Sequence, residues 1–474
     1  MQVKDLIRTF VKGGIISPGD FLKTLLVAEK LGATHVHFGS RQDILFAAQE
    51  KSSQVLEDTF QSIGMHYEVN TFTHQNISSS YVAQDILPGK HWLASHVYHY
   101  VLDSFDYKPS LRVNIVDPSQ GLVPLFTGQI NFIASNQENY WYVYLRFKSE
   151  QPAPWQMPLL VYTEDLNKIG QAIEEEDFLN SNKTYNEIFT FLTENVKMNT
   201  QPVTENLVLP ESQFPYYEGI NRLSDGKYWL GLYWRDNNYE INILKAIMER
   251  CIETEIGKVS LTPWKSFLIK GIFEKDRVGW EKLLGKFGMN LRHSSLELNW
   301  HLPALDREAL ELKFYLVREL DKLDVSTFGL TFTIATSDDI TLFSSVVIKK
   351  DSTEEGLFDI LYSKEFNPNL TDYFTYAKQV PKNVLPSLIV ELCRTYYEGM
   401  VREGRSSKVR AITDSVQKDL YQCIHCQTVY DSTLGDDLAG VEKDTTFQSL
   451  PETYICPTCG GGKSGFRKMK AKGL

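Results

Sequence analysis

The stretch YQCIHCQTVYDSTLGDDLAGVEKDTTFQSLPETYICPTCGGGKSGF, residues 421–466, holds two CxxC pairs. They are Cys423 with Cys426 and Cys456 with Cys459. Each pair predicts a tight turn that points two sulfurs at one ion, and two such turns together supply a tetrahedral set of four thiolates. Because about fifty residues bury too little surface for comfortable stability, we expect a bound metal to hold this segment together and its folding to be coupled to metal binding.

Tetrahedral sulfur ligation alone does not distinguish zinc from iron, because generic zinc ribbons also contain two CxxC pairs. The gap between Cys426 and Cys456 is longer than the usual ribbon spacing, which favours iron. The segment also contains an aromatic set that predicts a compact core, namely Tyr421, Tyr430, Phe447, Tyr454 and Phe466. The residues by themselves therefore leave iron and zinc as alternatives for an ion bound by four cysteines.

Residues 421–466 resemble rubredoxin almost without gaps. The motifs that carry the resemblance are YxCxxC (421–426), YD (430–431), GD (435–436), Gly440, TxFxxLP (445–451) and YICPTCG (454–460). Rubredoxins hold one iron in four cysteines and pass single electrons between proteins. The resemblance therefore implies a mononuclear, redox-active iron bound by the four cysteines, with zinc as the alternative. It also implies a role in electron transport, with a redox protein as donor or acceptor.

Two residues depart from the rubredoxin pattern. Gln427 stands where the family usually has Gly, and Tyr454 stands where it usually has Trp. A non-Gly residue in the left-handed conformation costs roughly 1–2 kcal/mol, so we expect the first turn to be reshaped. Altered hydrogen bonding to the sulfurs would in turn change the reduction potential of the metal.

The whole chain has 474 residues, which predicts about three domains. Its hydrophobic (42%) and charged (23%) fractions are those of a compact globular protein. The net charge of -11 argues against binding to nucleic acid or to an anionic membrane surface. No segment reaches the roughly 18 apolar residues of a membrane helix, and the N-terminus lacks the pattern of a signal peptide. We therefore expect a cytoplasmic protein.

A helix followed by a strand recurs along the chain. The first copy has a helical pattern at 21–31 and an alternating strand pattern, THVHFGSRQDILF, at 34–46. The second copy has INILKAIMERCIE (241–253) before KVSLTPWKSFLIKGI (258–272). Setting GSRQDILF of the first copy beside TPWKSFLI of the second puts a small polar pair, a basic residue and an apolar run in similar register. This repeat predicts two related α+β lobes around a pseudo-twofold axis.

The segments HFGSRQDIL (37–45), DGKYWLGLYW (225–234) and LTPWKSFLIKGI (261–272) resemble strands of the siroheme-dependent nitrite and sulfite reductases. The resemblance implies an α+β fold, with a reductase-like body of two pseudo-symmetric ferredoxin-like halves plus inserted α+β domains, followed by a small metal-bound β domain. The expected domains are a first ferredoxin-like half (1–70), an α+β domain (71–205), a second ferredoxin-like half (206–330), the C-terminal part of the body (331–400), a linker rich in charge and Ser (401–418) and the rubredoxin domain (419–470).

The reductase family holds its small anionic substrate over the haem in a pocket of Arg and Lys, because the oxyanion needs positive charge and proton donors. By resemblance, Arg41 matches one of these basic residues and Arg112 another, which makes both candidate anion-binding residues. Gln75 and Ser110 stand where the family has further basic residues.

The family also carries a 4Fe-4S cluster held by two cysteine pairs. In this chain Ser295 and His301 occupy two of the ligand positions, and no later CxxxC pair exists. A cluster with four cysteine ligands is therefore not expected, the body should have lost its siroheme and iron-sulfur chemistry, and no catalytic residue is predicted. His35 and His37, two apart on a strand, suggest a metal site, but no third ligand lies near them in sequence.

Three functions compete at this stage. The first is an electron carrier whose rubredoxin domain is tethered to a body that serves as a scaffold or docking surface. The second is an enzyme, a siroheme-type oxidoreductase of the nitrite/sulfite reductase kind that reduces a small oxyanion with electrons from the rubredoxin domain. The third is a zinc-stabilised interaction protein without redox activity. The sequence favours the electron carrier over the catalyst.

Overall fold

The structure is a computed structural model that describes most of the chain. The described residues are 4–49, 52–84, 86–87, 92–147, 153–210, 213–215, 217–234, 236–289, 299–337, 340–409, 420–432 and 434–468. The chain divides into two compact units, one made of residues 1–220 with 230–394 and the other of residues 221–229 with 395–474. None of the helices in the described ranges is long and apolar enough to cross a lipid bilayer.

The first repeat forms strands and helices close to the predicted positions. Its elements are β1 (Lys4–Thr9), β2 (Ile15–Ile16), α1 (Pro18–Lys30), β3 (His35–Phe38), β4 (Ile44–Gln49), α2 (Ser53–Gln61) and β5 (Tyr67–Val69). Ser17 caps α1, since its hydroxyl accepts a hydrogen bond from the backbone N–H of Asp20 at 3.0 Å. Gly32, with a φ of 87°, then lets the chain leave the helix. The helix predicted from apolar spacing is thereby confirmed.

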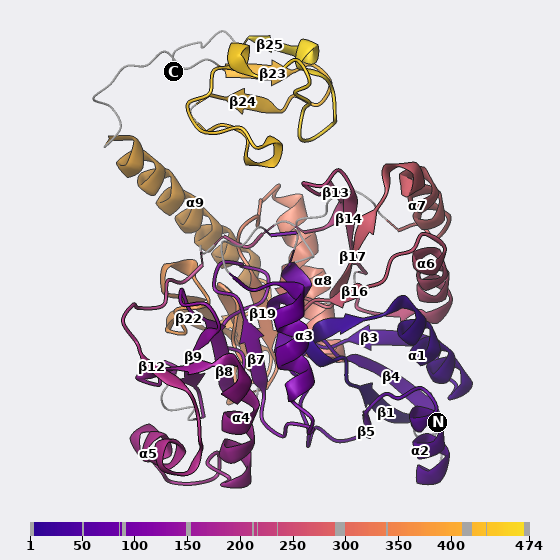
Figure 1. Cartoon of the computed structure of the whole chain (residues 1–474), viewed down its shortest axis with the longest axis vertical. Helices are drawn as coiled ribbons and strands as arrows, with labels where there is room; N and C mark the ends of the chain where they lie inside the picture. Colours follow the sequence, from indigo (N-terminus) through magenta and orange to yellow (C-terminus); the bar gives the residue numbers. More distant parts are fainter. Residues whose placement is uncertain are drawn as a thin grey trace. The chain divides into compact units, whose positions relative to one another are not determined.

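The second repeat shares the order β-β-α-β-β-α with the first, but its extra edge strand comes at the start of the repeat and not at its end. Its elements are β13 (Gly219–Arg222), β14 (Tyr228–Tyr233), β15 (Tyr239–Glu240), α6 (Ile241–Glu253), β16 (Val259–Leu261), β17 (Ser266–Ile272) and α7 (Glu274–Lys286). Helices α1 and α6 pack side by side (Figure 1). Gln42 and Lys265 occupy the same position in the aligned segments and share a left-handed backbone, with φ of 61° and 59°. The internal repeat read from the sequence is therefore confirmed.

The two repeats exchange one short strand each. The first sheet has the order β15-β3-β4-β1-β5, and the second has the order β13-β14-β17-β16-β2. In the first, Tyr239 pairs with Val36, and in the second, Ile16 pairs with Val259. Each predicted half therefore completes its sheet with a strand from the other, so the boundaries drawn at residues 70 and 206 separate strands that belong together.

The region between the repeats forms a larger sheet with helices on one face. Its elements are β6 (Ser78–Ser79), α3 (Ser95–Ser104), β7 (Val113–Val116), β8 (Ile130–Ala134), β9 (Tyr140–Leu145), β10 (Trp155–Gln156), β11 (Leu159–Tyr162), α4 (Leu166–Glu175), α5 (Tyr185–Asn195) and β12 (Thr200–Pro202). Trp141 packs into the core under the helices, whereas Tyr142 and Tyr144 pack on the opposite face. These aromatics pack the sheet, as their alternation in sequence predicts.

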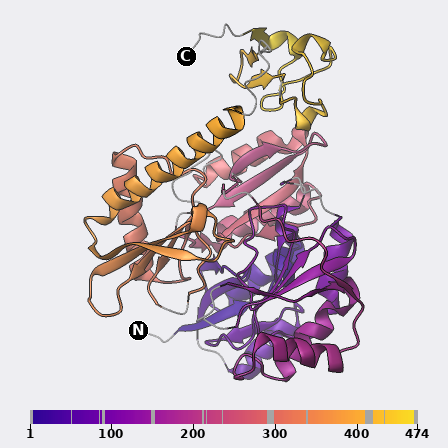
Figure 2. The same cartoon turned by 90° about the vertical axis from the view of Figure 1, so that its left-hand side faces the viewer.

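The last part of the body repeats the pattern of the middle sheet. Its elements are β18 (Trp300–His301), α8 (Arg307–Lys322), β19 (Phe332–Ala335), β20 (Val346–Lys350), β21 (Leu357–Ser363), β22 (Tyr373–Pro381) and α9 (Leu385–Val409). Strands β18 to β20 are parallel and β21 and β22 antiparallel to their neighbours, just as β6 to β8 are parallel and β9 antiparallel. The later strands of this sheet are orange in Figure 2.

The C-terminal segment is a small domain with little regular structure. Its three strands, β23 (Leu420–Cys423), β24 (Val429–Asp431) and β25 (Phe466–Lys468), form a sheet in the order β24-β23-β25. Short 3-10 turns connect the rest of the chain, which is yellow in Figures 1 and 2. The predicted small metal-bound β domain thus has the expected β fold.

The stretch 401–418, which the sequence predicts to be a linker, begins inside a helix. Helix α9 continues to Val409, and residues 410–418 lie outside the described residues. The letters VREGRSSKV contain Arg, Glu and Lys, which are good helix formers, and charge alone does not end a helix that has already been nucleated.

We expect Gly231 in β14 to be required for the second repeat to close. A Cβ atom at this position would lie 1.8 Å from the carbonyl oxygen of Tyr217, and backbone cannot move aside cheaply. Gly231→Ala should therefore destabilise the body by about 2 kcal/mol or more. The control is Gly285→Ala near the end of α7, where nothing lies within 4 Å and stability should rise by up to about 1 kcal/mol. Chemical unfolding of both variants tests this, and equal midpoints would contradict the close approach.

Candidate metal centre

Two matched turns position the four cysteines. In the first turn, Gln427 N–H donates to the carbonyl of Cys423 at 2.9 Å, and in the second, Gly460 N–H donates to that of Cys456 at 2.8 Å. Gln427 and Gly460, each four residues after the first cysteine of its pair, have φ of 64° and 72°. Gln427 adopts the left-handed backbone, so the reshaping of the first turn that we expected from a non-Gly residue here is wrong. The first turn keeps the shape of the second in spite of the strain of a side chain there.

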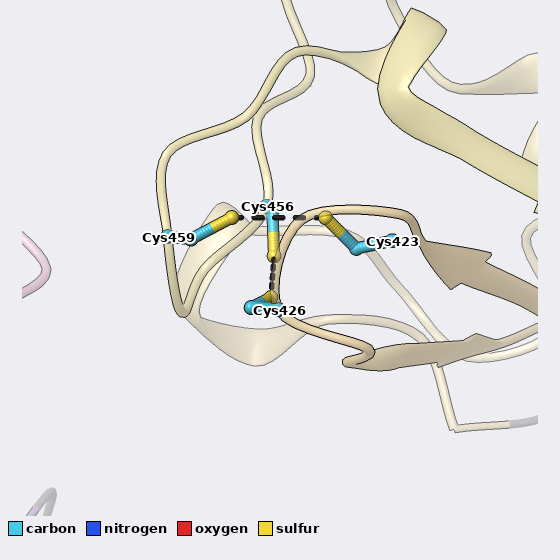
Figure 3. Close-up of side chains that lie close together, drawn as sticks. All are labelled: Cys423, Cys426, Cys456 and Cys459. Carbon is cyan, nitrogen blue, oxygen red and sulfur yellow. Dashed lines mark hydrogen bonds between the residues drawn. The ribbon is translucent and has the colours of Figure 1, made fainter.

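The four sulfurs converge on one point (Figure 3). All of them lie within 4.8 Å of one another, with 3.6 Å between Cys423 and Cys459 and 3.5 Å between Cys426 and Cys456. A tetrahedral ion with bonds of about 2.3 Å to sulfur requires sulfurs about 3.8 Å apart. The four side chains therefore fit a single tetrahedral ion, and this geometry suits both iron and zinc.

Hydrogen bonds favour negative charge on part of this sulfur set. Burial raises the pKa of Cys426, but hydrogen bonds with the Thr428 side chain, with the Thr428 backbone N–H and with the neighbouring cysteines outweigh it and lower that pKa to about 6. Burial raises the pKa of Cys456, although the N–H groups of Cys459 and Thr458 oppose the shift. A cation must therefore displace protons from the cluster before all the sulfurs can bind it.

Two threonines join the turns, and the sequence analysis overlooked them. The Thr428 hydroxyl lies 3.1 Å from Sγ of Cys426, and it donates to the Thr458 hydroxyl at 2.9 Å. Each threonine follows a cysteine by two residues, so a search for hydroxyl residues at that offset would have found the pair. The bridge ties the first turn to the second beside the sulfurs.

An aromatic core supports the turns. Tyr430, Phe447, Leu450 and Tyr454 are buried, with Tyr421 and Phe466 packed against them. The predicted aromatic core is therefore present. Tyr454, at the position usually held by Trp, donates its hydroxyl to Oδ2 of Asp436 at 2.8 Å, which satisfies a polar group that Trp would not bring.

The candidate anion-binding arginines lie within electrostatic reach of each other in the body. Arg41 is 9% exposed and donates to Oδ1 of Asn114 at 2.6 Å and to the carbonyls of Asn76 and Val113 at 2.8 and 2.7 Å. Burial, followed by the charge of Arg112, lowers the pKa of Arg41 to about 9. The Arg41 guanidinium is therefore committed to protein acceptors, and Nε is its one nitrogen without a partner.

Arg112 and the positions next to it in the predicted anion site are also bonded within the protein. Arg112 donates to the Thr341 hydroxyl at 2.6 Å. Gln75 donates from Nε2 to the carbonyl of Phe72 at 2.9 Å, and Ser110 donates from its backbone and hydroxyl to Glu174. The side chains at these positions thus form hydrogen bonds to other groups of the protein. The anion-binding role of Arg41 and Arg112 stays a prediction.

Among the described residues, the histidines that the sequence suggested as metal ligands, His35 and His37, do not belong to a group of potential metal ligands. His35 contacts the Thr34 hydroxyl at 2.9 Å, and His37 donates from Nδ1 to the carbonyl of Asn237 at 2.7 Å. His301 is buried in β18, and Ser295 lies outside the described residues. Within the described ranges, the one group of three or more side chains that could hold a metal ion together is the set of four cysteines.

The C-terminal segment is similar to known proteins over nearly its whole length. A family model for rubredoxin matches residues 420–466. The segment is 45% identical over 51 residues to the rubredoxin of Megasphaera elsdenii, which is 11% of this chain and 96% of that protein. It is also 45% identical over 49 residues to the high molecular weight rubredoxin of Moorella thermoacetica, which is 10% of this chain. The match spans 21% of the length of that relative.

The body is similar to a solved structure. The NirA protein of Mycobacterium tuberculosis superposes with a TM-score of 0.61, over 82% of this chain and 80% of that chain, at 14% sequence identity. At this identity the likeness shows the fold and not the chemistry. It confirms the reductase-like fold that the sequence resemblance predicted for the body.

We expect the small domain to depend on its metal. Cys456→Ser removes a buried ligand, so metal affinity should fall by at least about 100-fold, and residues 420–468 should lose their protection from hydrogen exchange because their core is small. Metal content by mass spectrometry and hydrogen exchange measure both effects. Cys251→Ala in α6 is the control and should keep the metal. A Cys456→Ser chain that retains protection in this segment would contradict the coupling.

We expect Arg41 to stabilise the body whether or not an anion is present. Arg41→Met leaves three buried acceptors without a donor, so the free energy of unfolding should fall by about 3 kcal/mol. Arg307→Met is the control, because that side chain is 90% exposed and should matter by less than about 0.5 kcal/mol. Denaturant unfolding in buffers free of added oxyanions measures the difference, and an unchanged midpoint for Arg41→Met would refute a structural role.

Proposed function

Because residues 420–466 match the rubredoxin model and cover 96% of a rubredoxin at 45% identity, the chain belongs to the rubredoxin family, and on that premise we propose that it is an electron carrier. It carries one electron at a time on a single iron held by Cys423, Cys426, Cys456 and Cys459. The observation that supports this proposal most directly is the convergence of the four sulfurs within 4.8 Å of one another.

Bound iron supplies a one-electron redox couple, and the chain's own residues adjust it. The backbone N–H groups of Thr428, Thr458, Cys459 and Gly461 hydrogen-bond to the cysteine sulfurs, which stabilises negative charge on them. The Thr428–Thr458 bridge holds the two turns together, so the ligand set keeps one shape. A site that changes little between charge states suits rapid electron exchange.

Exposure differs between the four ligands, which gives the site an open side. Cys423 and Cys456 are buried, Cys426 is half-buried and Cys459 is exposed. Ile424 and Ile455, which neighbour the buried ligands in sequence, are 49% and 39% exposed. We propose that a redox partner binds on this side. There it can contact the exposed apolar side chains of Ile424 and Ile455 and come close to the cysteine sulfurs.

The partner should be basic around its own redox centre. Between Cys423 and Phe466 the acidic residues outnumber the two lysines, Lys443 and Lys463. The acidic residues are Asp431, Asp436, Asp437, Glu442, Asp444 and Glu452. Such a charge pattern steers a basic protein in a manner that weakens as salt rises. The cytoplasmic location and the absence of nucleic-acid binding stay expectations from the sequence.

We propose further that the body serves as a scaffold or docking surface and no longer carries siroheme and iron-sulfur chemistry. Outside the small domain the chain has two cysteines, Cys251 in α6 and Cys393 in α9, which are too few for a cluster with four cysteine ligands. The commitment of Arg41 to protein acceptors supports the same proposal. Tethering the carrier to such a body makes electron transfer within the assembly effectively first order, at local concentrations up to about millimolar.

The test is metal analysis with an absorbance spectrum of the purified full chain. We expect one iron per chain and a visible sulfur-to-iron absorption that disappears after addition of one reducing equivalent, because iron changes oxidation state and zinc does not. A colourless, zinc-loaded protein from iron-replete cells would refute the carrier and favour the zinc-stabilised interaction protein. A tetrapyrrole absorption band that copurifies with the chain would refute the scaffold role and favour the siroheme-type oxidoreductase.

A further inference from the structure

A small cavity opens in the body where the second repeat meets the last sheet. Its volume is about 220 Å³, and its lining comes from several elements, among them β3, the turn before β17, β18 and the start of α8. Lys265, in the turn before β17, is one of the lining residues. This volume lies below the roughly 300–1,000 Å³ of pockets for drug-sized ligands. The cavity therefore suits a molecule smaller than a tetrapyrrole.

Lys265 reaches the cavity without a bonding partner. The residue is 5% exposed, and its one hydrogen bond among the described residues is accepted by its backbone carbonyl from the Tyr239 hydroxyl. Its backbone is also strained, with a φ of 59°. An ammonium group taken out of water needs a compensating acceptor, and an anionic group bound in the cavity would supply one.

A second buried lysine adds positive charge at this site. Lys313 is fully buried and donates to the Tyr233 hydroxyl at 2.7 Å, and Tyr233 lines the cavity. Burial, followed by the charge of Lys313, lowers the pKa of Lys265 to about 7. A negative charge in the cavity beside Lys265 would offset the burial of its ammonium and its repulsion by Lys313.

The carboxylates nearby are already committed to other donors. Asp306 accepts from the backbone N–H of Ala309 at 2.9 Å and from the Thr336 hydroxyl at 2.5 Å. Asp236 accepts from the backbone N–H of Asn238 at 3.2 Å, and Asp43 lies 3.6 Å from Arg8. None of them forms a hydrogen bond to Lys265, although the charges of Asp306 and Asp43 act on its ammonium, so Lys265 keeps an unused donor at the cavity.

His37 contributes no further positive charge at neutral pH. Its Nδ1 already donates to the carbonyl of Asn237, and burial lowers the pKa of its ring. The opposite wall is apolar, and Trp300, Leu302, Pro303 and Leu310 contribute to it. Arg307 also lines the cavity, but its side chain is 90% exposed and pairs with Glu311 at 2.8 Å. The site thus combines one buried cationic group, Lys265, with a hydrophobic surface.

We propose that this cavity binds a small organic monocarboxylate, whose carboxylate pairs with Lys265 and whose apolar body lies against Trp300, Leu302 and Leu310. An inorganic anion would leave the apolar side chains of the cavity in contact with water. A neutral apolar molecule would leave the ammonium of Lys265 without an anionic partner. This site is separate from the cysteine cluster, so it does not depend on the proposed electron-carrier function.

The test uses benzoate as the probe and the full chain as the protein. Isothermal titration calorimetry should detect benzoate binding to the unaltered chain, and benzamide, its neutral counterpart of the same shape, should bind at least about tenfold more weakly because it cannot pair with the ammonium. Sulfate, which has charge but no apolar body, should also bind at least about tenfold more weakly.

Lys265→Met identifies the residue responsible. The variant should lose benzoate binding by at least about tenfold while its unfolding midpoint is unchanged or higher, because it removes an unpaired buried amine. Lys23→Met in α1, where the side chain is 57% exposed, should bind benzoate as the unaltered chain does.

Equal binding of benzoate and benzamide, equal binding of sulfate, or undiminished binding by Lys265→Met would each overturn the proposal. Because the comparison of the three probes uses the unaltered chain, it decides the question even if the Lys265→Met chain fails to fold.

Discussion

Four thiolates held within 4.8 Å of one another repel strongly, and the small domain is organised around that repulsion. At an effective dielectric constant of 20, two unit charges 4 Å apart cost about 4 kcal/mol, so the cluster stays deprotonated as a whole only when a cation sits at its centre. The backbone N–H groups of the matched turns lower the cost of this charge, and the Thr428–Thr458 bridge holds the two turns together. The fold of the domain and its metal binding therefore depend on the same interaction.

The body contains two copies of one structural unit, and equivalent residues of the two copies make different contacts. Gln42 and Lys265 occupy equivalent turns with nearly equal φ, yet their surroundings diverge. The first turn is satisfied, because Gln42 donates to the carbonyl of Ser79 and its neighbour Arg41 has three acceptors. The second turn places an unpaired lysine against a cavity. Pseudo-symmetry of the backbone thus leaves the chemistry of each half free to differ.

The exchanged strands explain why the halves behave as one body. β2 and β15 are two residues long and would be marginal as isolated strands. Each gains its stability by completing the sheet of the other repeat, which ties the two halves together through hydrogen bonds. The packing of α1 against α6 adds an apolar contact along the same axis.

The sequence by itself determined the ligand set, the aromatic core and the internal repeat, because each rests on residues a few positions apart or on a recurring local pattern. Only the tertiary structure decided the strand exchange, the helical start of the stretch at 401–418, the acceptors of Arg41 and the cavity at Lys265. These features join residues separated by long stretches of chain, and such contacts depend on packing and hydrogen-bond satisfaction across the whole body, which local spacing does not encode.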